Sequence, residues 1–230
     1  MNKKHTLVIG GTTSLSESIL NVFNQNSHSI TSTYFTRKPD IPFVNWIKLD
    51  CNSNDSIANF ANIFSTLTNL TNLIFLTGIL PGKSIEDYTY EEIDTVININ
   101  FNSVAKVISS LTNHFNPGSH IMLMSSISGQ KGSFDPVYAA SKSAIIGLGK
   151  SLSQTLSPKT RTNVIAPGLV EQSSMCNQML PERRQYHVDN NPCRNLLKRN
   201  ALAEICYELT TEKWNHLNGA VIPVNGGTYV

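Results

Sequence analysis

Short apolar runs alternate with helical patterns along the whole chain. The first run, residues 6–9, ends at a glycine, and Ile19, Leu20, Val22 and Phe23 then recur at helical spacing. Further runs typical of short strands cover residues 29–34, 46–49, 73–76, 121–124, 161–165 and 220–224. Between them, helical patterns cover residues 57–67, residues 90–114 and a segment that begins near Pro136 and ends near residues 157–158.

This alternation predicts one α/β domain that spans residues 1–230. Strands separated by helices favour right-handed βαβ units, so the expected fold is doubly wound, with a mostly parallel Rossmann-type sheet and helices on both faces. No linker or internal repeat interrupts the pattern. In such sheets ligands bind beyond the carboxyl ends of the strands, near the point where the strand order reverses. The residues that carry chemistry should therefore follow the strands.

Composition and charge narrow the function classes. The chain has 230 residues, of which 40% are hydrophobic and 15% charged, and its formal net charge is +2. A nearly neutral chain has no broad field that favours nucleic acid or an anionic membrane. No stretch approaches the ~18 apolar residues of a membrane span, and the four cysteines show neither a CxxC pair nor metal-ligand spacing. We expect a cytoplasmic protein with reduced thiols, no metal, and no nucleic-acid or membrane partner.

The turn after the first strand is a candidate phosphate site. It begins at Gly10 and continues through Thr12, Thr13, Ser14 and Leu15 into the first helix. A tight turn from a strand into a helix presents backbone N–H groups and the positive end of the helix dipole to an anion. A glycine pair after a strand is also common in turns that bind nothing, so this feature alone does not identify a site.

Four polar residues in the second half of the sheet suggest acid–base chemistry. Tyr138 and Lys142 have i, i+4 spacing on one helix face, and a nearby Lys charge favours the phenolate of a tyrosine. Ser126 follows a buried strand, where its hydroxyl can reach a substrate carbonyl. Asn100 lies among apolar residues of a helix and needs a polar partner if it is buried. A solvated helix face is the alternative for the Tyr–Lys pair taken alone.

Together these residues resemble the short-chain dehydrogenase/reductase family in its compact single-domain form. The strand-end serine, the YxxxK pair and the helix asparagine of that family correspond to Ser126, Tyr138 with Lys142, and Asn100. Further matches are Asp50 after the third strand, a segment at residues 163–168 that resembles the family's VNxIxPG, and an ending at residues 218–227 that resembles its tGxxixvdGG. The resemblance covers nearly all of the chain.

The resemblance implies an oxidoreductase that transfers hydride between a nicotinamide and a carbonyl or secondary alcohol on a small, polar substrate. In that reading Tyr138 is the general acid/base, and Lys142 lowers its pKa and holds the nicotinamide ribose. Ser126 orients the substrate oxygen, and Asn100 holds a water that leads protons to Lys142. A homodimer or homotetramer is the expected assembly.

The same resemblance supplies a set of cofactor contacts. These are Gly10, Thr12, Thr13, Ser14, Leu15, Arg37, Asp50, Gly78, Tyr138, Lys142, Pro167, Gly168 and Val170. Enzymes that prefer NAD carry an acid near the end of the second strand to hold the ribose 2′-hydroxyl. Here the stretch after the second strand, residues 34–39, contains no acid; the first one that follows is Asp40. The fork of Arg37 can bind a 2′-phosphate. We expect NADP(H) to be preferred, with NAD(H) possible; a solvated turn is the alternative for Arg37.

Several positions depart from the family pattern. Ser14 and Ser16 replace two glycines of the first turn, Glu17 follows them, and Gln172 replaces a threonine of the segment after residue 168. Of the family's NNAG segment only Gly78 is kept. We expect Ser14 to donate to phosphate, Ser16 to push the helix slightly from the sheet, and Glu17 to repel the pyrophosphate, so that NADPH affinity is modest. The alternative is a catalytically inactive cofactor-sensing or scaffolding protein on the same fold.

Residues 171–200 occupy the place of the family's variable substrate lid. The segment is polar and contains Arg183, Arg184, His187 and Arg194. If these side chains face the site, an acidic or heavily hydroxylated substrate suits them. The alternative is a mobile surface loop with solvated charges.

Overall fold

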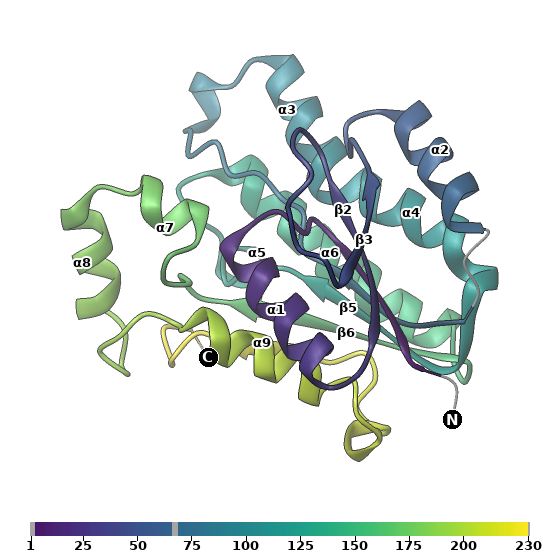
Figure 1. Ribbon diagram of the computed structural model, residues 1–230. Helices are drawn as coiled ribbons and strands as arrows, with labels where there is room; N and C mark the ends of the chain where they lie inside the picture. Colours follow the sequence, from purple (N-terminus) through teal and green to yellow (C-terminus); the bar gives the residue numbers. More distant parts are fainter. Residues whose placement is uncertain (1–2, 66–68, 230) are drawn as a thin grey trace.

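The chain is built around one parallel sheet, and the computed structural model describes residues 3–65 and 69–229 of it (Figure 1). The strands are β1 (His5–Ile9), β2 (Ser29–Tyr34), β3 (Val44–Lys48), β4 (Leu70–Phe75), β5 (Phe115–Met124), β6 (Thr160–Pro167) and β7 (Val221–Val224). Their order is β3-β2-β1-β4-β5-β6-β7, and every neighbouring pair is parallel. The order reverses between β1 and β4, so a ligand crevice is expected beyond the carboxyl ends of these two strands. The predicted doubly wound α/β fold is confirmed.

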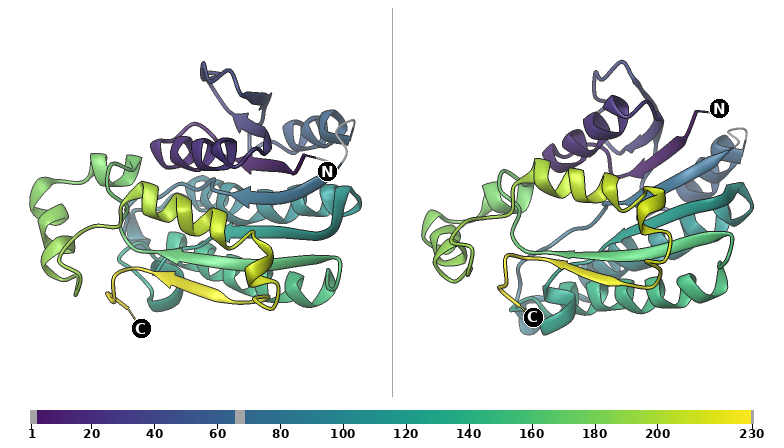
Figure 2. Two further views of the ribbon diagram at one scale, coloured as in Figure 1. Left: turned by 60° about the horizontal axis from the view of Figure 1, so that its bottom comes forward. Right: turned by 90° about the horizontal axis from the view of Figure 1, so that it is seen from below.

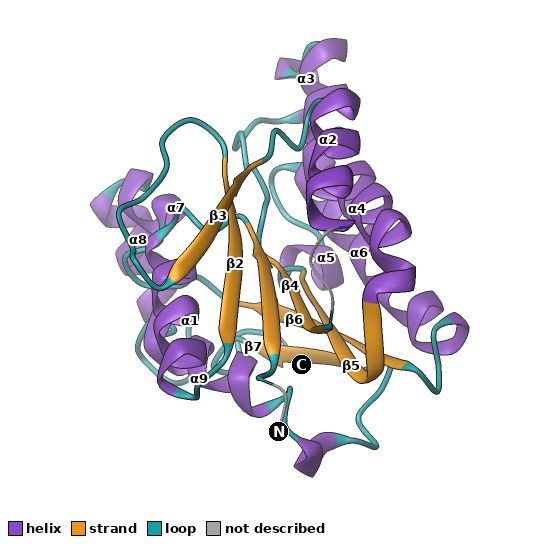
Figure 3. Cartoon of the chain, turned by 45° about the vertical axis from the view of Figure 1, so that its right-hand side comes forward, coloured by secondary structure: helices purple, strands orange, loops and turns teal. Residues whose placement is uncertain are grey.

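Helices cover both faces of the sheet. They are α1 (Ser14–Gln25), α2 (Asn54–Ser65), α3 (Tyr90–Ile97), α4 (Ser103–Leu111), α5 (Ser128–Lys131), α6 (Pro136–Thr155), α7 (Ser174–Gln178), α8 (Pro181–Asp189) and α9 (Arg199–Glu208). Single turns are η1 (Ile85–Asp87), η3 (Thr112–His114) and η4 (Glu212–Trp214), and a π-helical turn, η2 (Asn98–Asn102), joins α3 to α4. Figure 3 shows α2, α4 and α6 on one side of the sheet and α1 and α9 on the other, and the further views agree (Figure 2).

Two apolar clusters hold these layers together. Side chains that alternate along β1 divide between them: Leu7 and Ile9 join the cluster under α2, α4 and α6, and Val8 joins the one under α1 and α9. Phe60 and Phe64 of α2 are fully buried in the first cluster. Because both faces are covered, the central strands read as continuous apolar runs rather than as alternating ones.

The predicted elements differ from the structure mainly at their ends. The strand predicted at residues 121–124 begins at Phe115, and the helix predicted at residues 90–114 contains the π-helical turn. The helix predicted at residues 57–67 begins at Asn54 and ends at Ser65; residues 66–67 lie outside the described residues. Residues 171–200 contain the short helices α7 and α8, and no residue of α8 is buried, so the alternative of a mobile surface segment with solvated charges stays open.

The described part of the chain also bears on membrane, metal and redox chemistry. None of its helices combines the length and hydropathy needed to cross a bilayer. No group of three or more His, Cys, Asp or Glu side chains within it is placed to hold a metal ion. All four cysteines are free thiols.

Candidate active site

Helix α6 carries two of the predicted catalytic residues. It starts with Asp135 as N-cap and Pro136 in its first turn, where a missing N–H costs nothing. The Asp135 carboxylate accepts a hydrogen bond of 2.9 Å from the backbone N–H of Tyr138. Tyr138 and Lys142 are both buried, with exposed fractions of 6% and 4%. The solvated-face alternative for this pair is therefore wrong.

The end of β5 brings two serines against this helix. The Ser125 hydroxyl donates to the backbone carbonyl of Lys142 over 2.7 Å. The Ser126 hydroxyl lies near enough to the Tyr138 phenol to lower its pKa, and it accepts a hydrogen bond of 3.1 Å from the N–H of Ser128. The hydroxyls of Ser126 and Tyr138 thus converge on one point, which is the arrangement needed to hold a substrate oxygen.

Asn100 fixes the loop that follows β4. It lies fully buried in the π-helical turn, and its amide donates to the Ile79 carbonyl over 2.9 Å and to the Ser141 hydroxyl over 3.0 Å. Its Oδ1 accepts from the N–H of Ile79 over 2.8 Å. The amide is therefore occupied by protein partners, and the role structurally evident for the Asn100 side chain is to anchor this loop.

Gly78 is the one residue kept from the family's NNAG segment after the fourth strand. The structure shows why a glycine is needed at this position. A Cβ at Gly78 would lie 2.9 Å from the Lys142 ammonium and 3.5 Å from Oδ1 of Asn100. A larger residue would displace Lys142 from the site. Gly78, Asn100 and Lys142 therefore lie together, and Tyr138 is on the same helix as Lys142.

Burial controls the ionisation of the Tyr–Lys pair. Burial lowers the Lys142 pKa to about 8, and Nζ donates to the Met124 carbonyl over 3.0 Å. Burial also raises the Tyr138 pKa; the nearby Ser126 hydroxyl acts in the opposite direction, and the Asp135 charge raises it further. The expected lowering of the Tyr138 pKa by Lys142 is not seen in this arrangement. The physical reason is that the ammonium lies 5.9 Å from the Tyr138 ring centroid and is turned to Met124.

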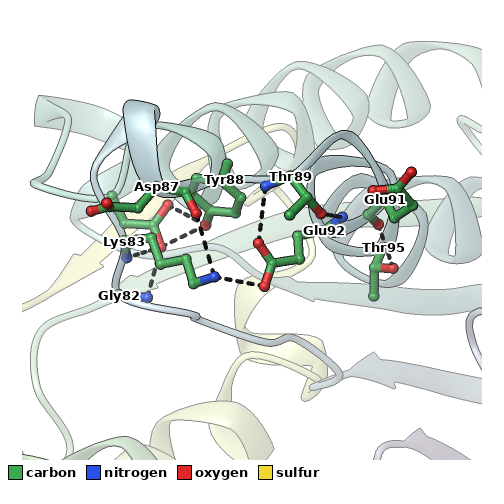
Figure 4. A network of polar contacts seen from close by, with 9 residues as sticks. Gly82, Lys83, Asp87, Tyr88, Thr89, Glu91, Glu92 and Thr95 are labelled. Atoms are coloured by element: carbon green, nitrogen blue, oxygen red, sulfur yellow. Dashed lines mark hydrogen bonds and ion pairs between the residues drawn. The ribbon is translucent and has the colours of Figure 1, made fainter.

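Asp135 is a site residue that the sequence reasoning missed. Its carboxylate is 2% exposed and accepts from the N–H of Gly82 over 2.9 Å and from the Tyr88 hydroxyl over 2.8 Å. In the same network Lys83 forms a 2.6 Å ion pair with Glu92, whose carboxylate caps α3 (Figure 4). Asp135 thereby ties the start of the catalytic helix to the loop after β4. An aspartate directly before a proline at a helix start was the available signal.

The first βα turn has the groups that a pyrophosphate needs. Gly10 has a φ of +90°, and a Cβ there would lie 2.7 Å from the Thr77 hydroxyl. Thr13 is the N-cap of α1. Within the described residues, the backbone N–H groups of Ser14 and Leu15 have no hydrogen-bond partner. Two free donors at the positive end of a helix fit the phosphates of a dinucleotide.

The residues that depart from the family pattern are placed differently from what was expected. The Ser14 hydroxyl donates to the Gln172 carbonyl over 2.6 Å, and its donation to phosphate stays a prediction. Ser16 is fully buried, and its hydroxyl donates back to the Thr13 carbonyl over 2.7 Å, so the added atoms stay inside the turn. Glu17 is exposed and lines a groove between α1 and α9, and its repulsion of a pyrophosphate stays a prediction.

The other predicted cofactor residues also follow strands, at the same edge of the sheet. Arg37 lies exposed after β2, and Asp50 lies half-buried after β3. Pro167 ends β6, and the N–H of Gly168 donates to the Val224 carbonyl over 3.0 Å. Val170 is buried, and Thr12 is exposed in the first turn.

A cavity of about 710 Å³ opens beside Ser126 and Tyr138. Most of its wall is apolar, which the expectation of a polar substrate did not anticipate. The apolar side chains include those of Ile79, Leu80, Phe134, Leu169, Met179 and Leu180. Of the four basic lid residues, Arg183 and His187 line the cavity. The other two bind backbone carbonyls: Arg184 donates to Met179 over 3.1 Å, and Arg194 to Asp189 over 2.6 Å.

Known proteins of similar sequence are reductases. A family model described as enoyl-(acyl carrier protein) reductase matches residues 10–229. The 3-oxoacyl-[acyl-carrier-protein] reductase FabG of Buchnera aphidicola subsp. Baizongia pistaciae is 28% identical over 189 residues, which cover 80% of this chain and 77% of that protein. The acetoacetyl-CoA reductase of Allochromatium vinosum is 29% identical over 162 residues, or 69% of this chain and 65% of the relative.

Solved structures match over almost the full length. A short chain dehydrogenase family protein from Francisella tularensis subsp. tularensis SCHU S4 superposes with a TM-score of 0.91 at 22% identity and covers 98% of each chain. A short chain dehydrogenase from Burkholderia cenocepacia J2315, in complex with NADP, gives a TM-score of 0.88 at 20% identity and covers 98% of this chain and 97% of its own. At these identities the likeness shows the fold alone.

Proposed function

Because the chain belongs to the short-chain dehydrogenase/reductase family, we propose that it transfers hydride between NADP(H) and a carbonyl or secondary alcohol of a small substrate. The observation that carries the proposal is the convergence of the Ser126 and Tyr138 hydroxyls at a cavity wall, with Lys142 buried behind them. A protein that only binds or scaffolds has no physical need for this convergence. We propose Tyr138, Lys142, Ser126 and Asn100 as the catalytic group.

In the reducing direction the chain must place a proton on the carbonyl oxygen. The raised pKa of Tyr138 keeps its hydroxyl protonated at neutral pH, so it can donate to an oxygen held by Ser126. The substrate gains this proton at oxygen and a hydride at carbon. When bound, the dinucleotide supplies or accepts the hydride. Lys142, with a pKa of about 8, is mostly cationic at neutral pH, and its ammonium would turn from the Met124 carbonyl toward the phenol to stabilise the phenolate that remains.

The residues at the carboxyl edge of the sheet fit a dinucleotide. The free N–H groups at the start of α1 would bind the pyrophosphate, Asp50 the adenine, and Pro167, Gly168 and Val170 would line the nicotinamide. Arg37 is exposed after β2 with no acid before Asp40, which supports NADP(H) over NAD(H). The Burkholderia relative in complex with NADP gives the same preference weak support. Residues 171–200 would act as the substrate lid.

Titration calorimetry with NADPH and NADH tests the cofactor assignment. We expect tighter binding of NADPH, and a loss of this preference in Arg37→Ala, because only a 2′-phosphate uses the guanidinium. Lys38→Ala is the matched control for charge in the same turn. Equal affinity for the two cofactors would contradict the preference for NADP(H).

One observation favours a second candidate, an inactive cofactor-sensing or scaffolding protein on the same fold. Ser14 occupies a family glycine position and is hydrogen-bonded across to Gln172, which narrows the approach to the first turn. The absence of any dinucleotide binding at millimolar concentration would favour this candidate and overturn the enzyme. The cytoplasmic location and the homodimer or homotetramer stay predictions for this chain.

A further inference from the structure

The outer part of the cavity carries a positive charge, that of Arg183, which has no ion-pair partner among the described residues. We propose that Arg183 and His187 form an anion-binding subsite, so that the substrate bears a carboxylate or phosphate group at the end remote from the reacting carbonyl. This inference rests on the proposed function, since it places the carbonyl at Ser126 and Tyr138. It adds a chemical class of substrate that the family resemblance does not supply.

Arg183 differs from its neighbours in having free donors. The guanidinium groups of Arg184 and Arg194 bind the carbonyls of Met179 and Asp189. Within the described residues, the Arg183 guanidinium has neither a hydrogen bond nor an ion pair, and it lines the cavity. A guanidinium is always charged and presents up to five N–H donors in a fork that matches a carboxylate or phosphate. Arg183 is exposed and lines the cavity, so its unused donors are accessible to a ligand there.

The cavity wall holds no carboxylate that could pair with this charge. Among the described lining residues, Asp135 is the one acid. Its carboxylate already accepts from the N–H groups of Gly82 and Tyr138 and from the Tyr88 hydroxyl, and it is 2% exposed. It is therefore fully bonded and turned into the protein.

His187 shows that the basic groups lie close together. Burial lowers its pKa, and the charges of Arg183 and Lys131 lower it further, so both cations act on the imidazole. Lys131 belongs to α5, whereas Arg183 and His187 lie one turn apart on α8. Cations from two separate helices thus lie near His187, and of the two Arg183 also lines the cavity. An anion bound there would gain from both charges and from the imidazole N–H.

The other described residues of the wall carry no cationic side chain, and apart from Asp135 its polar groups there are neutral hydroxyls and amides such as those of Ser133, Ser174 and Gln178. Phe134, Met175, Met179 and Leu180 offer no donor to a charged group. In Figure 1, α8 lies at the outer edge of the molecule, beyond α7 and away from the sheet. A substrate would therefore extend from its carbonyl at the sheet, through an apolar section, to its anionic end at α8. A few polar groups in an otherwise apolar pocket usually fix ligand orientation in this way.

Matched pairs of ketones test the subsite through turnover. Levulinate is compared with methyl levulinate, and dihydroxyacetone phosphate with dihydroxyacetone, with NADPH in excess. We expect a lower KM for the charged member of at least one pair, and the pair that shows it distinguishes a carboxylate from a phosphate. Arg183→Gln should reduce the KM ratio between neutral and charged members by about 10- to 100-fold, the usual effect of losing a hydrogen bond to a charged group. Arg183→Lys should keep part of the ratio.

The control variant is Arg199→Gln. It removes one positive charge from α9 at the groove beside α1, outside the cavity, and should leave the KM ratio as in the unmodified protein. An unmodified protein that handles both members of both pairs equally would overturn the subsite. So would an Arg183→Gln variant that retains the ratio.

A second readout separates the subsite from the proposed reaction. The melting temperature is measured with the same four compounds in the presence of NADPH, which requires binding but no turnover. Stabilisation by a charged member that Arg183→Gln abolishes would support the subsite even if no compound is reduced, and the reductase proposal would then be the one that fails. Reduction of the ketones without any preference for the charged members, in KM or in melting temperature, would overturn the subsite alone.

Discussion

At the residue scale, the Tyr138 hydroxyl is subject to opposing effects. Burial and the Asp135 charge raise its pKa, and the nearby Ser126 hydroxyl lowers it. Lys142 contributes packing against the ring in this arrangement, because its ammonium is bound to the Met124 carbonyl. A high pKa keeps the phenol protonated at neutral pH but makes it a weaker proton donor, so transfer to a carbonyl oxygen depends on stabilisation of the phenolate. The phenolate it leaves behind needs the Lys142 charge.

The Tyr138→Phe substitution removes one hydroxyl and little else. We expect kcat to fall about 10²- to 10⁴-fold, the usual contribution of a positioned proton donor. The backbone N–H of residue 138 still donates to Asp135, so the melting temperature should change little. Steady-state kinetics and a thermal melt check both expectations. A near-normal rate would show that another group supplies the proton.

Asp135→Asn tests the carboxylate that joins the catalytic helix to the loop after β4. Asparagine keeps the N-cap but has one acceptor oxygen in place of two, so one partner among Gly82, Tyr88 and Tyr138 loses its bond. We expect a loss of about 1–3 kcal/mol in the free energy of unfolding. Removal of the negative charge should also lower the Tyr138 pKa, so any limb of the pH–rate profile that reports Tyr138 moves to lower pH.

Asp87→Asn is the control for this pair of measurements. Asp87 is an exposed carboxylate in the same network, and it accepts from Ser84 rather than from the catalytic helix. The control should leave both the unfolding free energy and the pH–rate profile close to those of the unmodified protein. If Asp135→Asn also leaves the free energy of unfolding and the pH–rate profile unchanged, Asp135 does not position Tyr138.

At the element scale, hydrophobic periodicity predicted every strand of the sheet and the long helices that pack on it, except α9, which buries Leu202, Ala203 and Cys206 and was not predicted. It missed α8, because no residue of that helix is buried and an exposed polar helix has no apolar face to detect. It also missed the π-helical turn at Asn98–Asn102. There Asn100 binds Ile79 and Ser141, and such long-range partners leave no mark in the local pattern.

The hydrogen bond between Ser14 and Gln172 was equally beyond prediction from sequence. It joins the first turn of α1 to the segment before α7, and residue 172 adopts a left-handed φ of 57° to present its carbonyl. A bond from Ser14 to phosphate would therefore compete with a protein acceptor that is distant in sequence. The two departures from the family pattern at these positions are therefore structurally linked.

Two substitutions at Ser14 separate the effect of this bond from the effect of the side-chain atoms. Ser14→Gly removes both the bond and the side-chain atoms, so the phosphates can approach the backbone closely. We expect NADPH to bind several-fold more tightly, which corresponds to ~0.5–1.5 kcal/mol, the net contribution of one hydrogen bond. Ser14→Ala removes only the bond to Gln172. It should accelerate amide hydrogen exchange in α7 without the gain in affinity. Calorimetry and exchange mass spectrometry check the pair, and equal affinities for the two variants would contradict the close-approach argument.

At the scale of the whole molecule, the two ends of the sheet have different roles. The carboxyl ends of the strands carry the candidate active site. Near the amino ends, a buried polar row crosses the sheet, in which Thr6, Asn72, His120 and Arg161 are register neighbours. His28 joins it through a 2.8 Å hydrogen bond to Thr6. Substitutions in this row should change stability while leaving the catalytic geometry intact.

The buried histidines of this row predict that the free energy of unfolding decreases in mild acid. Burial is the main cause that lowers the pKa of His28 to about 4 and that of His120 to about 3. The same side chains in the unfolded chain titrate near 6.5. Between these values the unfolded state binds protons that the folded state does not, so unfolding becomes more favourable as the pH falls from about 6.5 toward 4.

Urea unfolding at pH 7.5 and pH 5 measures this difference directly. His120→Gln should reduce the loss of unfolding free energy between the two pH values, because glutamine carries no proton to be taken up on unfolding. It can still hydrogen-bond Asn163, which His120 contacts over 3.1 Å. His216→Gln, at an exposed position, is the matched control and should retain the full pH dependence. If His120→Gln loses as much stability at pH 5 as the control does, the acid sensitivity must come from groups other than this buried imidazole.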